Sequence, residues 1–469
     1  MKTKTLTTLI IGLLFLSPQW SNAQDWEKTF VDSFGLSKGF ALLETSDQGY
    51  VIAGEIDLPT GALRHHIWMV KTDLDGNELW SKIYDYYNIG YRSARAIAET
   101  VDQDLLLVGS DGFSKALVFK TASNGDSLWT KGFGGNGVNS FYDIVGTDDN
   151  NFILVGSFEA ETGGNGNTEI WAMGMNAAGD SLWSKKYFAP ATFNSAAMDI
   201  SPLPSGNYLI SGKINGQGFA LEILGTDGTE IWSNTYNLST EDIFLTSALN
   251  TNTGNILLGG TASGIAGYSP SLIEINQSGG FLNPVPFVPS DFGVITAMAA
   301  TSDNGFILTG SSYDFWNQNG NEVGFISKLD NNLNTEWEII YSDSLTIQGA
   351  AIRQNTDGSY LIAGSREGGM FLKKIAGSIN ATSSINTSEF SANVFPNPAT
   401  DKLCIEIPPQ QLQTDLAIRF YSVDGKLINQ YSIDNPSEYI QLSAFPKGFY
   451  TYVIFHGQKE LISGKLVIH

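Results

Sequence analysis

The chain has 469 residues and a formal net charge of −22 at pH 7, because 48 acidic residues oppose 26 basic ones. Such acidity repels nucleic acids and anionic membranes, so neither is expected as a partner. The 50 glycines, the 12% aromatic content and the single cysteine, Cys404, indicate an all-β protein with many turns and exclude an intramolecular disulfide. The length allows two or more domains.

Residues 1–23 have the three parts of a secretory signal peptide. Lys2 and Lys4 form a basic start, residues 6–16 an apolar centre, and residues 21–23 a cleavage site of small residues. The apolar run is too short for a stable membrane anchor, which needs about 20 residues. We therefore predict a mature chain that begins near residue 24 and has no transmembrane segment after signal cleavage.

A repeated pattern dominates residues 24–377. Each repeat contains a short apolar run that closes on a glycine, and these glycines recur every 47 to 56 residues, at Gly54, Gly109, Gly156, Gly212, Gly259, Gly310 and Gly364. Seven repeats with a period of about 50 residues are typical of a β-propeller. The sequence therefore predicts a seven-bladed β-propeller over residues 24–377.

Each repeat predicts four strands. A first apolar strand leads into a turn such as Thr45–Gly49, and the second strand is the apolar run, which lacks alternation and so suits a strand buried on both faces. A third, alternating strand ends in an Asp-Gly or Asn-Gly hairpin, which tolerates the positive φ angles of tight turns. The fourth strand carries a tryptophan, such as Trp80, which we expect to cover the seam between neighbouring blades.

The two ends of the repeat region complement each other. The seventh repeat stops before its tryptophan-bearing strand, whereas the mature chain starts with a segment of that kind, residues 25–31. We predict that residues 25–31 pair beside residues 370–375 and close the ring, which removes exposed sheet edges. In the fifth repeat Asn283 replaces the tryptophan between prolines, which predicts a shortened outer strand.

Insertions at residues 57–66, 161–168 and 313–321 lie between the second and third predicted strands. They would share one rim of the propeller, and a rim rich in variable loops is where ligands usually bind. The aromatic residues Tyr313, Phe315 and Trp316 are therefore candidate ligand-binding residues. The alternative is that these aromatic side chains only cover a blade edge.

The C-terminal part has a different pattern. Residues 378–393 are rich in Ser, Thr and Asn, which is typical of a linker. Residues 394–469 contain strand-like runs separated by Asp-Gly and His-Gly turns, which predict a small, immunoglobulin-like β-sandwich. Cys404, in its first strand, is interpreted as a small buried hydrophobic residue.

Several motifs of this segment occur in the order found in one known family. They include Phe395, Pro396, Asn397 and Pro398 at the start, Gly425 in the central hairpin, Gly448 and Tyr450 before the penultimate strand, and Lys465 near the end. Residues 394–469 thereby resemble the type A C-terminal sorting domain of the type IX secretion system. The alternative is an accessory immunoglobulin-like module that binds carbohydrate.

The resemblance implies delivery rather than chemistry. Its expected partners are the type IX translocon and a sortase-like peptidase. The expected location is secreted or attached to the cell surface, reached through the periplasm and outer membrane of a Gram-negative bacterium.

No catalytic constellation is evident in the sequence, and no cofactor or metal is expected. His65 and His66 are adjacent, and adjacent side chains on a strand point to opposite faces. The turn Thr45–Gly49 resembles the Asp-box of sialidases but lacks its final tryptophan. Residues 73–77 resemble the start of a calcium loop without its late acidic ligand. We interpret both as turns; the propeller's weak resemblance to quinoprotein-like and WD-like repeats concerns blade packing.

Three functions remain open from the sequence. The first is an exported propeller binding module for a glycan or a protein, without enzymatic activity. The second is a polysaccharide-active enzyme, which would need paired carboxylates or metal ligands at the central channel, and none occurs at a recognisable spacing. The third is a structural protein of the cell surface or matrix.

Overall fold

The computed structural model describes a set of ranges of the chain, and every regular element in them is a β-strand. The ranges are 25–32, 36–57, 65–84, 93–159, 167–193, 195–237, 242–264, 267–285, 293–313, 322–340, 347–366, 368–377, 385–386, 392–395, 399–400, 402–407, 412, 416–422, 427–442, 445–456 and 459–468. Within these residues no helix is long and apolar enough to cross a membrane.

The described residues between 25 and 377 form seven antiparallel sheets. The first three contain β2 (Ser37–Thr45), β3 (Gly49–Asp57), β4 (His65–Thr72) and β5 (Glu78–Tyr84); β6 (Ser93–Glu99), β7 (Leu105–Ser110), β8 (Ala116–Thr121) and β9 (Ser127–Phe133); and β10 (Ser140–Gly146), β11 (Phe152–Phe158), β12 (Asn167–Met175) and β13 (Ser181–Phe193). The fourth and fifth contain β14 (Ala196–Pro202), β15 (Tyr208–Ile214), β16 (Gln217–Ile223) and β17 (Glu230–Tyr236); and β18 (Asp242–Asn250), β19 (Ile256–Gly264), β20 (Gly267–Ile275) and β21 (Phe281–Val285).

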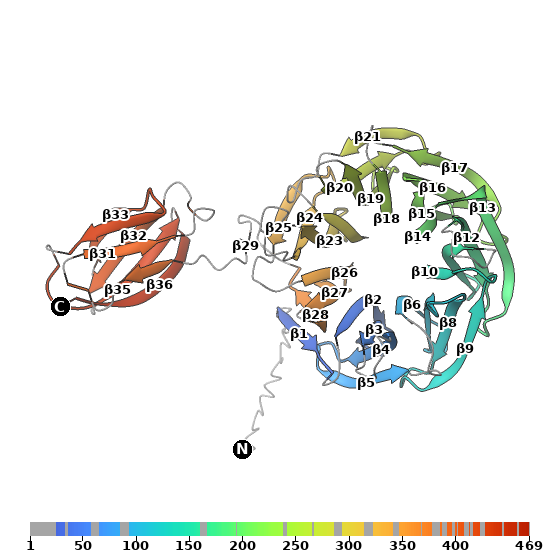
Figure 1. The fold of residues 1–469 in the computed structure, drawn as a ribbon, viewed down its shortest axis with the longest axis horizontal. Helices are drawn as coiled ribbons and strands as arrows, with labels where there is room; N and C mark the ends of the chain where they lie inside the picture. The colour runs from blue at the N-terminus through green and yellow to red at the C-terminus, as the bar shows by residue number, and fades with distance from the viewer. Residues whose placement is uncertain are drawn as a thin grey trace, which may run out of the picture.

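The sixth and seventh sheets complete the set. They contain β22 (Val294–Ala300), β23 (Phe306–Tyr313), β24 (Glu322–Leu329) and β25 (Thr335–Ile340); and β26 (Ile347–Gln354), β27 (Tyr360–Arg366), β28 (Gly369–Ile375) and β1 (Trp26–Phe30). The short β29 (Ile385–Asn386), inside the predicted linker, pairs in parallel with β25. Each first strand contacts the first strand of the next sheet, and β26 contacts β2, so the sheets form a closed ring, as in a propeller (Figure 1).

The ring is closed by the N-terminal strand. Strand β1 pairs antiparallel with β28, with Trp26 opposite Lys374 and Phe30 opposite Met370. Glu27 forms ion pairs with Arg366 and with Lys373, the latter at 3.2 Å. The sequence prediction that this segment supplies the missing strand is therefore confirmed.

The apolar cores lie between neighbouring sheets. Strand β3 is buried from Gly49 to Ile56, and Ile52 and Val70 of the first sheet share a cluster with Leu361 of the seventh. Because both faces of each second strand meet other sheets, these strands have no polar face, as the uniform apolar runs predicted. Strand β21 is short, as expected from the prolines of the fifth repeat.

The outer-strand tryptophans pack across the seams. Gly125, at φ +79° in the hairpin of the second sheet, lies against the ring of Trp80 in the first sheet, and an added Cβ would approach that ring to 2.9 Å. Equivalent contacts join Trp26 to Gly76, Trp129 to Gly179, Trp183 to Gly228 and Trp232 to Gly279. Positive φ and close approach together require glycine there. The predicted role of the tryptophans in covering the seams is confirmed.

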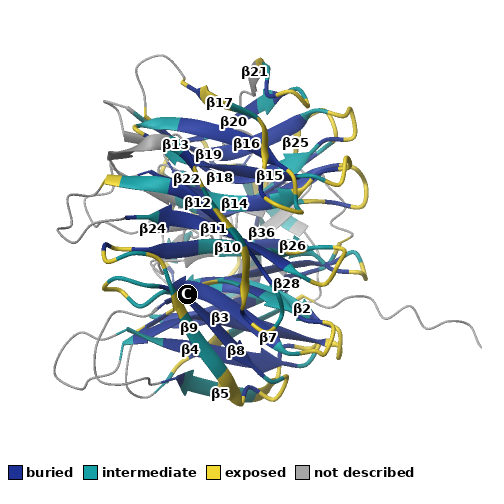
Figure 2. Cartoon of the chain, turned by 90° about the vertical axis from the view of Figure 1, so that its right-hand side faces the viewer, coloured by how far each residue is buried: buried dark blue, intermediate teal, exposed yellow. Residues whose placement is uncertain are grey.

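The connections emerge at two opposite faces of the ring. The turn face carries the connections from first to second and from third to fourth strand; its tight turns project to the right in Figure 2. The loop face carries the connections from second to third strand and from each sheet to the next. The inserted residues 58–64 therefore belong to the loop face, whereas His65 and His66 begin β4 rather than lying in the insertion as the sequence suggested.

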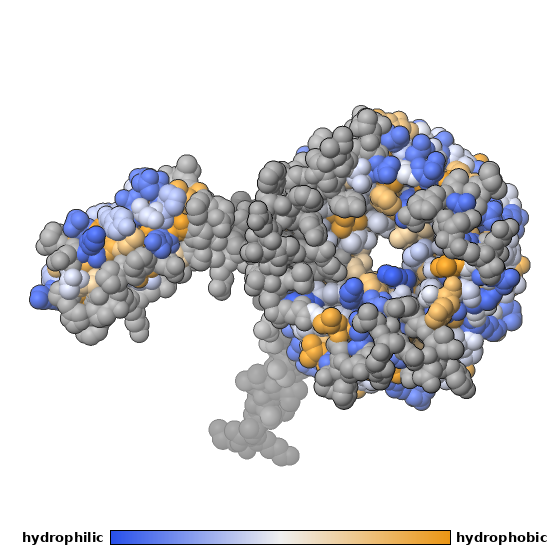
Figure 3. Space-filling model, viewed as in Figure 1, coloured by the Kyte–Doolittle hydropathy of each residue, from blue (hydrophilic) through white to orange (hydrophobic). Residues whose placement is uncertain are grey.

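Every first strand has a β-bulge at the same place. The register shifts once in each of the seven, at Phe40, Arg95, Tyr142, Met198, Thr246, Thr296 and Ala350. A bulge bends its strand and redirects the side chain of the extra residue. These strands surround the central opening of the ring, which Figure 3 shows from the loop face.

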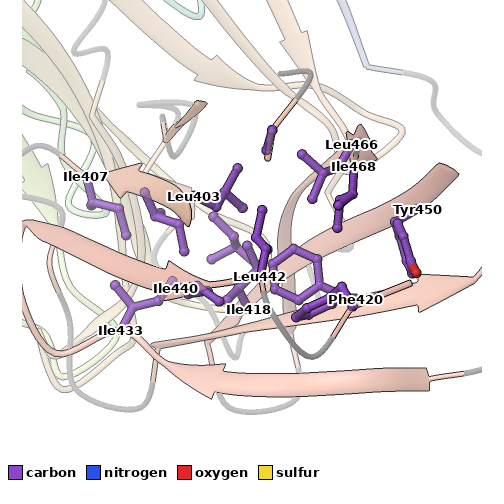
Figure 4. Close-up of a cluster of buried hydrophobic side chains, with 14 of the residues drawn as sticks. Leu403, Ile407, Ile418, Phe420, Ile433, Ile440, Leu442, Tyr450, Leu466 and Ile468 are labelled. Carbon is purple, nitrogen blue, oxygen red and sulfur yellow. The ribbon is translucent and has the colours of Figure 1, made fainter. Parts of the chain in front are cut away.

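The C-terminal residues form two further sheets. One contains β30 (Asn393–Phe395), β31 (Lys402–Glu406) and β34 (Ser437–Gln441); the other contains β32 (Leu416–Ser422), β33 (Leu427–Ser432), β35 (Gly448–His456) and β36 (Lys459–Ile468). Leu403 of the first sheet and Phe420 and Leu466 of the second share one buried cluster (Figure 4). Cys404 is buried, as expected.

Candidate functional site

The loop face has a polar cavity of about 320 Å³ beside the central channel. It spans the first three sheets and is lined by Glu55, His65, Ser93, Arg95, Ser110, Gly112, Ser140 and Tyr142. The ends of β3 and β7 and the beginnings of β4, β6 and β10 meet there, because antiparallel pairing brings these strand ends to the same face. Cavities of this size are at the lower end of the range for small-ligand sites.

Two bulge residues line this cavity. Arg95 is the extra residue of β6 and Tyr142 that of β10, so the bulges direct both side chains toward the space between neighbouring sheets. The exposed Arg95 guanidinium lies 4.4 Å from the ring centre of Phe40, the bulge residue of β2. Among the described residues, Arg95 has no carboxylate partner.

The wall formed by the first sheet carries His65 and Glu55. The His65 Nδ1 atom lies 3.8 Å from a Glu55 carboxylate oxygen and also contacts Asp57. His65 of β4 lies directly opposite Asp57 of β3 in the strand pairing, so the two side chains are on the same face at the end of the sheet. The side of the cavity formed by the first sheet therefore presents a carboxylate and an imidazole, and Arg95 of the second sheet lies on the neighbouring side.

Hydroxyl groups form the rest of the lining. Ser93 and Ser140 are buried, and the Ser110 hydroxyl accepts a hydrogen bond of 2.9 Å from the Gly112 amide. Beside the cavity, Asp111 accepts hydrogen bonds from the amides of residues 113, 114 and 115, and Lys115 donates to two carbonyls of the next connection. The cavity is thus supported by connections that are hydrogen-bonded to each other.

A pair of carboxylates lies at the inner edge of the third and fourth sheets. Asp143 and Asp199 directly follow the bulges of β10 and β14, where other first strands have Ala or Ser. Asp143 accepts hydrogen bonds from the amides of Ile144 at 2.8 Å and Ile200 at 2.9 Å, and Asp199 accepts one from Ala248 at 3.1 Å. Each carboxylate thereby joins its own sheet to the next one.

Both members of this pair ionise less readily than an ordinary aspartate. Burial raises the pKa of Asp143 to about 6 despite its two amide hydrogen bonds. Burial, followed by the negative charge of Asp143, raises the pKa of Asp199 well above its usual range. The two residues are only partly exposed, and each carboxylate accepts hydrogen bonds from backbone amides.

The turn carboxylates have a different environment. Asp47 accepts hydrogen bonds from Lys71 and Thr45; these outweigh its partial burial and lower the pKa of Asp47. Asp73, of the calcium-like sequence, accepts hydrogen bonds from the amides of Asp75 at 2.9 Å and Asn77 at 2.8 Å. Both motifs are turns, as predicted. Among the described residues, no group of three or more His, Cys, Asp or Glu is placed to hold a metal ion.

The residues predicted to bind a ligand lie mostly outside the described residues. Phe315 and Trp316 lie outside the described residues. Of Tyr313, at the end of β23, only the backbone is described. In the tail, Pro396, Asn397, Pro398 and Gly425 lie outside as well, while Phe395, Gly448, Tyr450 and Lys465 belong to strands. The Tyr450 hydroxyl donates to the Pro446 carbonyl at 2.6 Å.

Sequence reasoning missed the cavity and the carboxylate pair. Arg95 and Tyr142 occupy the same bulge position in consecutive repeats, and Asp143 and Asp199 the position after it. An alignment of the first strands of the repeats would have revealed two aspartates among small residues. The bulges themselves have no distinctive sequence signal, because their residues range from Phe to Ala.

The C-terminal segment matches a known family. Residues 393–469 match the family described as "Secretion system C-terminal sorting domain". The protein is thus a cargo of the type IX secretion system, exported through the outer membrane to the cell surface or the extracellular space. No curated protein matches the chain.

Solved structures with a similar chain course include the following three proteins. They are virginiamycin B lyase from Staphylococcus aureus (14% identity, TM-score 0.49, 75% of this chain and 99% of that one), the WD40 domain of Neurospora crassa Pan2 (11%, 0.46, 74% and 91%) and PorZ, a surface component of the type IX secretion system of Porphyromonas gingivalis (11%, 0.33, 94% and 59%).

Proposed function

We propose that this protein is an exported binding module that recognises a glycan through the loop face of its propeller. The observation that carries the proposal is the polar cavity of about 320 Å³, which combines a guanidinium, an imidazole, a carboxylate and several hydroxyl groups. A small number of polar groups placed around a concave site fixes the orientation of a polar ligand. The tail delivers this module to the outside of the cell.

The proposal includes a domain organisation. Residues 1–23 are a cleaved signal peptide, residues 24–377 a seven-bladed propeller, residues 378–393 a linker and residues 394–469 a small β-sandwich that a sortase-like peptidase removes. Seven sheets with their first strands in a closed ring support the blade number. The buried cluster shared by the two C-terminal sheets supports the sandwich.

Binding of the full mature chain to an array of bacterial and host polysaccharides tests the function. We expect saturable binding to one glycan class. Saturable binding only to a protein would replace the glycan with a protein ligand. Absence of saturable binding to any glycan or protein would contradict a binding module and favour a structural surface protein.

A second candidate function is a polysaccharide-active enzyme, which the carboxylate pair favours. A carboxylic acid with a raised pKa is the group needed for general acid catalysis. The hydrogen bonds of Asp143 and Asp199 to neighbouring strands instead favour a structural role. Release of reducing ends from a bound polysaccharide, lost in Asp143→Asn, would establish the enzyme; binding without release would exclude it for that polysaccharide.

A further inference from the structure

We infer that the loop-face cavity is a subsite for the carboxylate of a uronate residue, so that the ligand is an acidic polysaccharide. The inference rests on the proposed function and gives it a chemical class. It starts from Arg95, whose position in the cavity is set by the bulge of β6.

Arg95 differs from the buried cations of the propeller in having no carboxylate partner among the described residues. The chain has 48 acidic and 26 basic residues, and the buried cations of the repeats pair with carboxylates. Lys120 lies 2.9 Å from Asp104, Lys328 2.9 Å from Asp303 and Lys374 2.8 Å from Asp357. Arg95 instead stacks on Phe40, which holds the plane of the guanidinium while leaving its edge free to donate to an anion.

A guanidinium edge suits a carboxylate in particular. Two parallel N–H donors match the two oxygens of a carboxylate, and such bidentate pairs give both affinity and orientation. The overall negative charge of the protein opposes binding of a polyanion at long range, so this local donor has to supply the selectivity. His65 adds an imidazole to the lining, a second side chain with an N–H donor.

The remaining lining groups suit a sugar ring rather than a peptide. The hydroxyls of Ser93, Ser140 and Tyr142 can each donate and accept hydrogen bonds, and Glu55 can accept from a sugar hydroxyl. Peptide sites usually offer an unpaired strand edge or an apolar groove. The cavity offers no apolar groove, since its lining is polar. Strands β6 and β10 are edge strands that pair on one side only, so the choice of a sugar rests on the hydroxyl-rich lining.

The test compares oligogalacturonate with its methyl ester, which keeps the sugar ring and removes the charge. We expect the full mature chain to bind the acid at least about tenfold more tightly than the ester, as the loss of a charge-assisted hydrogen bond implies. Arg95→Gln should abolish this preference and lower the affinity for the acid by a similar factor. Calorimetric titration at low and moderate salt measures both.

Lys213→Gln is the matched control. Lys213 also stacks on an aromatic ring, with its Nζ atom 4.7 Å from the centre of Phe244, but it does not line the cavity. Its removal should leave the preference for the acid unchanged. An equal loss in both variants would show a general charge effect and overturn the subsite.

The other outcomes separate the inference from the proposed function. Equal affinity for acid and ester, or binding of neutral glycans only, would overturn the uronate subsite while the glycan-binding module stands. Tighter binding of polyglutamate than of oligogalacturonate would assign the cavity to an acidic peptide. Binding of no glycan at all would contradict both proposals.

Discussion

The two faces of the ring differ in how regular they are. On the turn face the connections range only from three residues at 46–48 to six at 224–229, whereas on the loop face they range from two at 215–216 to eight at 85–92. The turn face repeats the same contacts: Asp73, Asn176, Asn276 and Asp330 each accept hydrogen bonds from amides of their own hairpin. Among the described residues of the loop face, a contact of this kind occurs at Asp111, which accepts hydrogen bonds from the amides of residues 113, 114 and 115.

The difference indicates a division of tasks. Contacts that join one sheet to the next, such as Trp80 on Gly125, occur at the turn face and return in most repeats. Side chains that are not needed to pack one sheet against the next, such as Arg95 beside the cavity, occur at the loop face. We therefore expect substitutions at the turn face to change stability and substitutions at the loop face to change binding.

The largest effect is expected when ring closure is broken. Deletion of residues 24–34 removes β1, exposes the edge of β28 and leaves Gly76 without the ring of Trp26. We expect the melting temperature to fall by about 10 °C or more, since strand pairing and a buried seam are lost together. Calorimetry of the mature chain measures this; an unchanged melting temperature would show that β1 does not close the ring in solution.

A smaller effect on stability is expected when the contact between one pair of neighbouring sheets is disrupted. Trp80→Ala removes an aromatic side chain that packs against the buried cluster shared by the first and second sheets, which includes Met69 and Leu107. We expect a loss of about 3 kcal/mol in the free energy of unfolding, in the range for large aromatic truncations. The neighbouring Leu79, 60% exposed, is the control, because Leu79→Ala should change stability by less than about 0.5 kcal/mol. Equal effects in denaturant unfolding would refute the seam role.

The turn carboxylates predict sensitivity to acid. Partial burial opposes ionisation of Asp303, but hydrogen bonds from Thr301 and Lys328 outweigh it and lower its pKa to about 2. A lowered folded-state pKa stabilises the protein above the unfolded-state pKa of about 4 and loses that contribution as the pH falls through about 2. The melting temperature should therefore fall between pH 4 and 2, and fall less in Asp303→Asn. An identical decline in both proteins would contradict the role of this pair.

The smallest effect on stability is expected at the cavity. The exposed Arg95 forms no ion pair with the other described residues, so Arg95→Gln should shift the free energy of unfolding by less than about 0.5 kcal/mol. Denaturant unfolding and the binding titration together give the change in stability and the change in affinity for the same variant. A loss of stability comparable to that of Trp80→Ala would mean that the loop face is not free of structural constraint.

Much of the architecture could be predicted because packing recurs in every repeat. The buried second strands, the hairpin glycines and the closing strand at residues 25–31 all have local sequence signals. One detail was less apparent: in the first turn the positive φ belongs to Gln48. Gly49 is needed instead because an added Cβ would lie 2.3 Å from the Thr72 carbonyl oxygen, and such a close approach has no local pattern.

The sequence alone determined that the chain is all-β, built from repeats of about 50 residues and ended by a sorting tail, because short-range turn chemistry and periodic burial specify these features. Only the tertiary structure brought Arg95 and Tyr142 to one cavity with His65, and Asp143 within electrostatic reach of Asp199. These residues come from different sheets. Their proximity depends on how the ring closes and on bulges whose residues range from Phe to Ala, so no sequence spacing encodes it.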